Sequence, residues 1–173
     1  MNPHIPRDVV HRWSEDCAND ANVFAGQARR LLEGQSRLAR FFKSNVPAME
    51  GQAGDVSLYL LAVIIRLFER AGGRANKVGA VEIEAATRKI GKYAKQLLPG
   101  DDGFPGRVRE VADRAQPHIL DEALHALFER EERKENEAQV EPAQAALVFL
   151  MLWAATEALD LAWRAPPAPE WAE

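Results

Sequence analysis

The chain has 173 residues, of which 47 % are hydrophobic and 28 % charged, and its formal net charge at pH 7 is −4. This length and apolar content suffice for one domain with a full hydrophobic core. Cys17 is the only cysteine, which excludes an intramolecular disulfide, and residues 1–10 contain no apolar stretch of the kind that a signal peptide needs. We therefore expect a cytoplasmic protein with a single domain over residues 1–165 and a proline-rich tail over 166–173.

The small net charge is the balance of two oppositely charged parts of the chain. Residues 23–98 contain thirteen Lys and Arg against six Asp and Glu, whereas residues 99–173 contain seven against sixteen. Opposite charges of this kind can hold two parts of one fold together, drive self-association, or offer a basic face to an anionic partner. The sequence leaves these three alternatives open.

The first predicted helix is long. Apolar residues recur at spacings of three, four or seven from just after Pro6 to about Ser44, which predicts one continuous helical stripe. Poor helix formers between residues 19 and 22 and at Gly34 allow a bend that would divide this helix in two. Cys17 lies on the apolar stripe, so we expect a buried thiol rather than a nucleophile.

Five further helices follow along the chain. Asp55 is a suitable N-cap for a helix over residues 56–71, which ends at two glycines. Further helices are predicted over residues 80–98, 107–115, 117–136 and 143–163, each set off by Gly or Pro. No segment alternates apolar and polar residues for long enough to predict a strand. The sequence therefore predicts an all-α protein, a bundle of five to seven helices.

Two of these helices are expected at the centre of the core. Residues 56–71 and 143–163 are apolar on almost every side, and such helices are buried by other helices. The uninterrupted apolar run within the second covers residues 145–155, well short of the roughly twenty residues that a membrane span needs. We therefore expect no membrane partner. Arg66 lies inside the first central helix and needs an acidic partner, for which Glu69, Glu157 and Asp160 are candidates; we favour an ion pair between the two central helices.

Basic side chains form stripes on two of the predicted helices. At 100° per residue, those of the first helix share one face, and a second stripe lies on the helix over residues 80–98 and in the turn before it. These candidate partner-binding residues are Arg29, Arg30, Arg37, Arg40, Lys43, Arg74, Lys77, Arg88, Lys92 and Lys95. Side by side, the stripes would form a groove for nucleic acid backbone or for an acidic protein surface, including that of a second copy. The alternative is a solvated face, neutralised by the acidic part of the same chain.

Residues able to bind a metal gather in the last two predicted helices. Glu122 and His125 have the Glu-x-x-His spacing of metal-binding helices. In an antiparallel hairpin centred near Gln139, Glu157 comes level with Glu122 and Asp160 close to the level of His118, so that Glu122, His125, Glu157 and Asp160 could converge. Such a carboxylate-rich set predicts a divalent transition metal as the cofactor of an enzyme. The competing interpretation is the solvated side of an amphipathic helix, since the sequence contains no second Glu-x-x-His.

The basic stripes favour a non-catalytic binding or assembly module without a cofactor. Its partner would be an acidic protein, a second copy or nucleic acid. Nucleic acid would be contacted through its phosphate backbone, because no aromatic residues alternate with the basic ones to stack on bases. The metal-dependent enzyme is the alternative.

Overall fold

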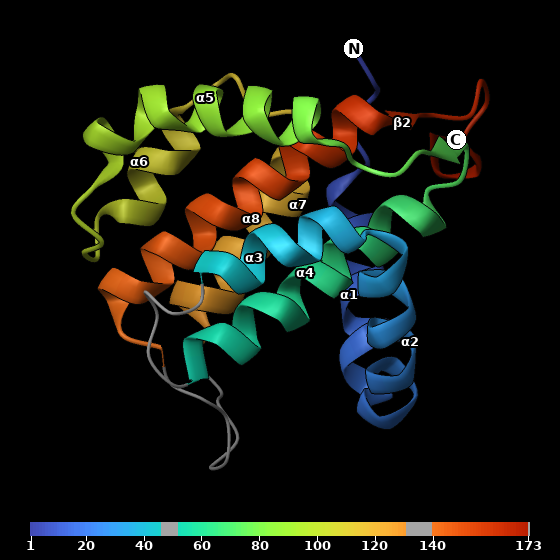
Figure 1. Cartoon of the computed structure of the whole chain (residues 1–173), viewed down its shortest axis with the longest axis horizontal. Helices are drawn as coiled ribbons and strands as arrows, with labels where there is room; N and C mark the ends of the chain where they lie inside the picture. The colour runs from blue at the N-terminus through green and yellow to red at the C-terminus, as the bar shows by residue number, and fades with distance from the viewer. Residues whose placement is uncertain (46–51, 131–139, 173) are drawn as a thin grey trace.

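The computed structural model describes residues 1–45, 52–130 and 140–172, and these residues are mostly helical, with 75 % of them in helices and 3 % in strands. The helices are α1 (Arg7–Asn19), α2 (Ala21–Gly34), α3 (Ser36–Asn45), α4 (Gln52–Arg70), α5 (Ala80–Leu97), α6 (Phe104–Glu110), α7 (Pro117–Leu124) and α8 (Pro142–Ala162) (Figure 1). A π-helical turn, η2 (His125–Glu129), continues α7, and a short 3-10 helix, η3 (Glu170–Ala172), lies near the C-terminus. Two short strands, β1 (Arg74–Ala75) and β2 (Trp163–Arg164), pair antiparallel.

The long first helix of the prediction is divided into three, which raises the number of α-helices in the described residues to eight. Asp20 interrupts it first and caps α2, because its carboxylate accepts a hydrogen bond from the backbone N–H of Val23. Gln35 interrupts it again, with non-helical backbone angles (φ −116°, ψ 51°). The expected range of five to seven helices is therefore too low.

Helices α8 and α4 occupy the centre of the molecule, as their composition predicts. Helix α8 packs against α5, α4 and α7, and its central Trp153 is fully buried among Phe149 and Tyr93. By length and composition α8 passes as a membrane span, but 78 % of its most apolar window is buried inside the protein. This burial is that of a core helix packed by other helices.

Other helix boundaries differ from the prediction where tertiary packing determines the residue at which a helix begins or ends. Helix α6 begins at Phe104, earlier than expected, because Phe104 is fully buried against Phe128 and Phe149. Helix α7 ends at Leu124, and the chain continues as the π-helical turn η2, which ends at Glu129 because Arg130 has extended backbone angles. Of the helix expected to reach residue 136, residues 131–136 fall outside the described residues. The bounds of α5 and α8 agree with the prediction to within one residue at each end.

The tail of the chain folds back on the domain. The indole N–H of Trp171 donates a hydrogen bond of 3.0 Å to the carbonyl of Ala71 at the end of α4. At the other terminus, the Asn2 side chain donates to the carbonyls of Asp160 and Trp163 at the end of α8. Both termini are therefore held at the same end of the central helices.

Cys17 is buried on the apolar side of α1, as predicted, and burial raises the pKa of its thiol. The expected ion pair between the central helices is wrong. Arg66 instead pairs at 2.6 Å with Glu69 of the same helix, one of the candidate partners, and Glu69 also binds Arg30 of α2.

Candidate functional site

The structure divides the predicted basic stripes into groups with different roles. On α2, Arg29 pairs with Glu33 one turn later, and Arg30 forms two hydrogen bonds to Glu69 of α4, at 3.0 and 3.2 Å. The Arg30 guanidinium lowers the pKa of Glu69, although burial works in the opposite direction. Arg30 therefore attaches α2 to α4, and the break at Gln35 separates both arginines from the stripe on α3.

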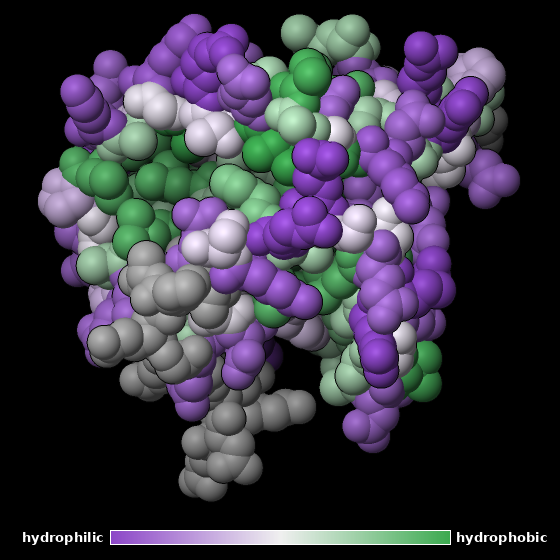
Figure 2. All heavy atoms as spheres, viewed as in Figure 1, coloured by the Kyte–Doolittle hydropathy of each residue, from purple (hydrophilic) through white to green (hydrophobic). Residues whose placement is uncertain are grey.

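Helices α3 and α5 enclose an apolar groove, here called the α3–α5 groove. Its volume is about 320 Å³, and α8 forms its floor. Figure 2 shows the apolar atoms gathered between α5 and α3, with hydrophilic side chains nearby. The residues lining it are Phe41, Asn45, Thr87, Ile90, Gly91, Ala94, Leu147, Leu150, Met151 and Ala154.

Basic side chains lie on both helices beside this groove. Arg40 and Lys43 of α3, and Lys92 and Lys95 of α5, are exposed and have no ion-pair partner within the part of the chain that the structure describes. Arg88 pairs with Glu84, but both side chains are about 70 % exposed, so this contact holds Arg88 weakly. The groove thus combines an apolar floor with cations available to a partner.

A buried glutamine connects the start of α3 to the segment before α5, and the remaining basic residues lie on or near these two segments. The side chain of Gln35 accepts a hydrogen bond from the N–H of Val78 at 2.9 Å and donates one to the carbonyl of Asn76 at 3.2 Å. These bonds hold the start of α3, which carries Arg37, against the segment that carries Lys77. Arg74 lies in β1, directly opposite Arg164 of β2.

The four residues of the metal hypothesis do not converge. Glu157 is only 7 % exposed and accepts hydrogen bonds from Trp153 Nε1, the N–H of Ala115 and Nζ of Lys89, each at 2.9 to 3.0 Å. Burial opposes the charge on Lys89, but its hydrogen bonds to Glu157 and Asp113 raise its pKa overall. Glu157 therefore holds α5 and the segment before α7 against α8.

Asp160 has a similar structural role. It accepts a hydrogen bond from Gln116 at 2.9 Å, and burial raises the pKa of its carboxyl. Among the described residues, no group of three or more His, Cys, Asp and Glu is placed to hold a metal ion. The predicted register is wrong because Glu157 and Asp160 face α5 and the segment before α7, whereas Glu122 and His125 face α1 and α4.

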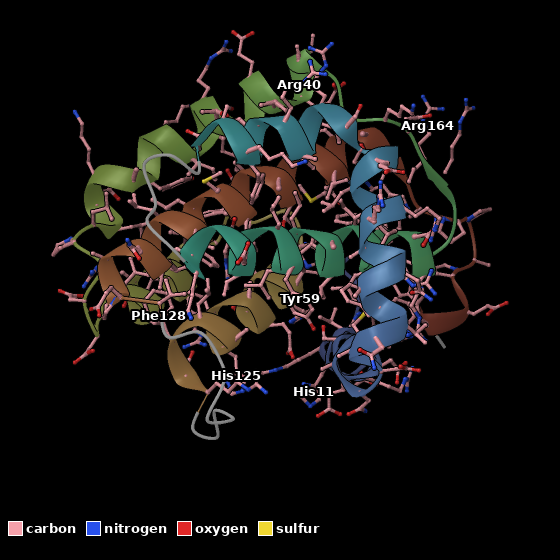
Figure 3. All side chains as sticks on the ribbon, turned by 60° about the horizontal axis from the view of Figure 1, so that its bottom comes forward. His11, Arg40, Tyr59, His125, Phe128 and Arg164 are labelled. Atoms are coloured by element: carbon pink, nitrogen blue, oxygen red, sulfur yellow. The ribbon has the colours of Figure 1, made fainter. Side chains whose placement is uncertain are left out.

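Glu122 and His125 instead line a second opening, here called the α1–α4–α7 cleft, with a volume of about 300 Å³. In Figure 3, His11 and His125 lie near each other at one edge of the molecule, and Arg40 lies at the opposite edge. His11 contacts two carboxylates: its Nδ1 lies 3.1 Å from Glu122 Oε1, and its Nε2 lies 3.3 Å from Glu15 Oε1.

The sequence did not identify His11 or Ser14 as site residues. The available signal was local: Ser14 and Glu15 follow His11 by three and four residues, which places all three on one side of α1. That α7 crosses this side of α1 could not be read from the sequence. No protein-family model, curated protein or solved structure matches this chain.

Proposed function

We propose that the protein is a binding module, folded as one domain over residues 1–165, whose α3–α5 groove accepts an acidic, amphipathic segment of a partner protein. The observation that carries this proposal is a set of exposed cations, without ion-pair partners among the described residues, on the two helices that line an apolar groove: Arg40 and Lys43 on α3, Lys92 and Lys95 on α5. A helix with apolar residues on one face and carboxylates beside them would complement both features.

The apolar floor favours a protein partner over nucleic acid. Leu147 is 41 % exposed, and it lies beside Met151 and Ile90 along the groove. Aliphatic side chains of a partner would bury this surface, with a gain of roughly 25 cal/mol for each Å² removed from water. A phosphate backbone would satisfy the cations but would leave the groove floor exposed to water.

A designed peptide tests the proposal. The probe is a fluorescein-labelled peptide of about sixteen residues, with Leu at every third or fourth position and Glu elsewhere. A control peptide has the same composition in an order that breaks the apolar stripe. We expect saturable binding of the first peptide in fluorescence anisotropy, at least about tenfold weaker binding of the second, and lower affinity at higher salt.

Two protein variants locate the binding. Ala94→Trp fills the groove and should abolish binding, while circular dichroism reports whether the variant remains folded. Arg29→Glu changes the same kind of charge on α2, away from the groove, and should leave the affinity unchanged.

Other partners give other outcomes. Binding of labelled single- or double-stranded oligonucleotides, with no preference for the ordered peptide, would assign the basic residues to nucleic acid and overturn the proposal. A concentration-dependent increase in mass in sedimentation equilibrium that Ala94→Trp removes would assign the groove to a second copy. Equal binding of the ordered and scrambled peptides would show that charge alone attracts them.

A further inference from the structure

The antiparallel pair of strands β1 and β2 places two arginines side by side, at the end of the molecule near the C-terminus (Figure 1). Arg74 lies directly opposite Arg164, and Ala75 lies opposite Trp163. Residues that oppose each other in an antiparallel pair point to the same face, and successive residues point to opposite faces. Trp163 is buried, so Arg74 and Arg164 share the face that points away from the core, and both are exposed.

The backbone that carries the two arginines is held closely. Gly73 has a φ of +74°, and a Cβ atom at this position would lie 2.2 Å from the carbonyl oxygen of Arg164, so only glycine allows this approach. The indole N–H of Trp163 donates a hydrogen bond of 2.8 Å to the carbonyl of Gly72. Asn76 donates two hydrogen bonds to the end of α8, at 3.0 and 3.2 Å. The two arginines therefore start from fixed positions next to each other.

Neither arginine has a partner that compensates its charge. Among the residues that the structure describes, neither guanidinium group takes part in a hydrogen bond or an ion pair. The exposed Glu170 lies in the tail that folds back on this end of the molecule, but it forms no ion pair with them. Like charges directly opposite each other on neighbouring strands destabilise the pair. An arrangement that costs stability and is not compensated within the described fold indicates that an anion from outside completes it.

The surroundings of the arginine pair are also basic. Lys77 follows Arg74 by three residues, which an extended segment spans in about 10 Å. Arg37 follows Gln35, whose side chain bonds to the segment at residues 76–78. Both cations are exposed and have no ion-pair partner in the described part of the chain. The local potential is therefore positive and attracts anions.

We propose that Arg74 and Arg164 bind a phosphate monoester, that is, a phosphate group attached to its carrier through one oxygen. A guanidinium group presents parallel N–H donors that match the oxygens of a phosphate or a carboxylate. A monoester has three free oxygens and nearly two negative charges at neutral pH, so both guanidinium groups contact it at once and neutralise it. A carboxylate or a phosphodiester has one charge and two free oxygens, which a single guanidinium group satisfies.

This site is separate from the α3–α5 groove. Neither arginine lines the groove, whose floor on α8 extends as far as Ala154. The helical residues between Ala154 and Ala162 span about 12 Å, and Arg164 lies beyond them in β2. Phosphate binding by the arginine pair therefore does not rest on the proposed function, and either proposal can fail without the other.

Matched probes test the chemistry. The first, here called the phosphopeptide, is a capped pentapeptide with phosphoserine at its centre and glycine elsewhere, and its comparison has glutamate at the centre. Phenyl phosphate is a free monoester, and dimethyl phosphate is a diester. Binding is measured at neutral pH and low salt from the arginine Nε–H and backbone amide signals of ¹⁵N-labelled protein.

The two monoesters should bind and the other two probes should not compete with them. We expect the phosphopeptide and phenyl phosphate to bind with dissociation constants on the order of 1 mM, and the glutamate peptide and dimethyl phosphate to bind at least about fivefold more weakly. Equal affinities of the phosphopeptide and the glutamate peptide would overturn the proposal. A phosphopeptide that binds more tightly than phenyl phosphate would support a phosphorylated protein segment as the source, and equal affinities would support a free phosphorylated compound.

Variants separate the arginine pair from charge alone. Arg74→Gln and Arg164→Gln should each weaken the phosphopeptide at least about fivefold, and Arg164→Lys, which keeps the charge but loses the paired donors, about threefold. Arg12→Gln removes an exposed arginine of α1 that also has no ion-pair partner among the described residues, and it should leave the affinity unchanged. Native affinity in Arg164→Lys, or an equal loss in Arg12→Gln, would overturn the proposal.

The repulsion between the arginines is measured without a ligand. Arg164→Gln should raise the midpoint of thermal unfolding by about 1 to 2 °C at low salt, and the gain should shrink at high salt because salt screens the repulsion. The phosphopeptide should stabilise the native protein more than this variant. A lower midpoint of Arg164→Gln at low salt would show that Arg164 serves the fold, and this would contradict its assignment to a ligand.

Discussion

The α3–α5 groove and the α1–α4–α7 cleft are apolar openings of nearly equal volume, about 320 and 300 Å³, but their charged groups are arranged differently. The cations beside the groove have no partners within the described ranges, so they are available to another molecule. In the cleft, by contrast, His11 already contacts two carboxylates. Apolar volume alone therefore does not define a ligand. What matters as well is whether the neighbouring polar groups already have partners within the fold.

The largest expected effect is on stability, and it distinguishes two lysines of α5, one with a structural role and one exposed. Lys89 is bound to the buried carboxylate of Glu157, whereas Lys92 is exposed beside the groove. Lys89→Met leaves that carboxylate short of its cation and should lower the free energy of unfolding by about 3 kcal/mol. Lys92→Met should change it by less than about 0.5 kcal/mol. Urea unfolding measures both, and similar losses in the two variants would contradict the division of α5 into a structural and a binding side.

The next largest effect is expected on binding, in an experiment that tests two variants with both probes. The double variant Arg40→Glu, Lys95→Glu should lower the affinity of the groove for the acidic peptide at least about tenfold, because it reverses two nearby charges. The same variant should bind the phosphopeptide within about twofold of the native protein, because salt screens charges at a distance. Conversely, Arg164→Gln should weaken the phosphopeptide and leave the acidic peptide unaffected. Titrations of both variants with both probes test this, and loss of both ligands in either variant would show that the two sites are coupled.

Ser14→Ala should make the protein more stable. Removing a buried hydroxyl without a partner and placing Ala in a helix both favour the folded state, by about 1 kcal/mol together. The midpoint of urea unfolding measures the gain. Ser36→Ala at the start of α3 is the control, and it should give no such increase. A destabilised Ser14→Ala protein would mean that the hydroxyl is bonded within the fold.

The smallest expected effect is the pH dependence of stability that comes from Asp160, which the metal hypothesis had grouped with Glu122 and Glu157. Burial raises its pKa, so the folded state holds a proton more tightly than the unfolded state does. Stability therefore falls as the pH rises from the usual aspartate range through the raised value. Asp160→Asn keeps the acceptor for Gln116 and should be slightly more stable than the native protein at pH 7, with the difference vanishing at acid pH. Thermal unfolding at several pH values tests this, with the exposed Asp102→Asn as control.

Helices that are determined by signals in their own segment of the sequence could be predicted. Helix α8 follows from a long apolar run that begins with Pro142, and α5 follows from regular apolar spacing between Gly79 and Pro99; the structure confirms both to within a residue at each end. Gly34 allows a bend beside Gln35, but the sequence does not show that Gln35 leaves the helical conformation to bond with the segment at residues 76–78. Such a bond depends on tertiary neighbours.

The same difference separates the features of the candidate sites that could be read from the sequence from those that could not. The sequence identified the basic residues of α3 and α5, since composition and helical periodicity are enough to find an exposed stripe. It misassigned Glu157, whose partners Lys89 and Ala115 come from two distant segments. It also missed the pairing of Arg74 with Arg164, because these residues become neighbours only once the segments after α4 and α8 form β1 and β2.

The central claim is that one protein carries two separate sites for anionic partners, the α3–α5 groove for an acidic amphipathic segment and the arginine pair for a phosphate. The most direct test is to titrate ¹⁵N-labelled protein with the acidic peptide and, separately, with the phosphopeptide, and to map the amide shifts. The account predicts that the acidic peptide shifts the amides of α3, α5 and the first half of α8, and that the phosphopeptide shifts those of β1 and β2. Shifts of the same residues by both probes, or acidic-peptide shifts confined to α2, would contradict it.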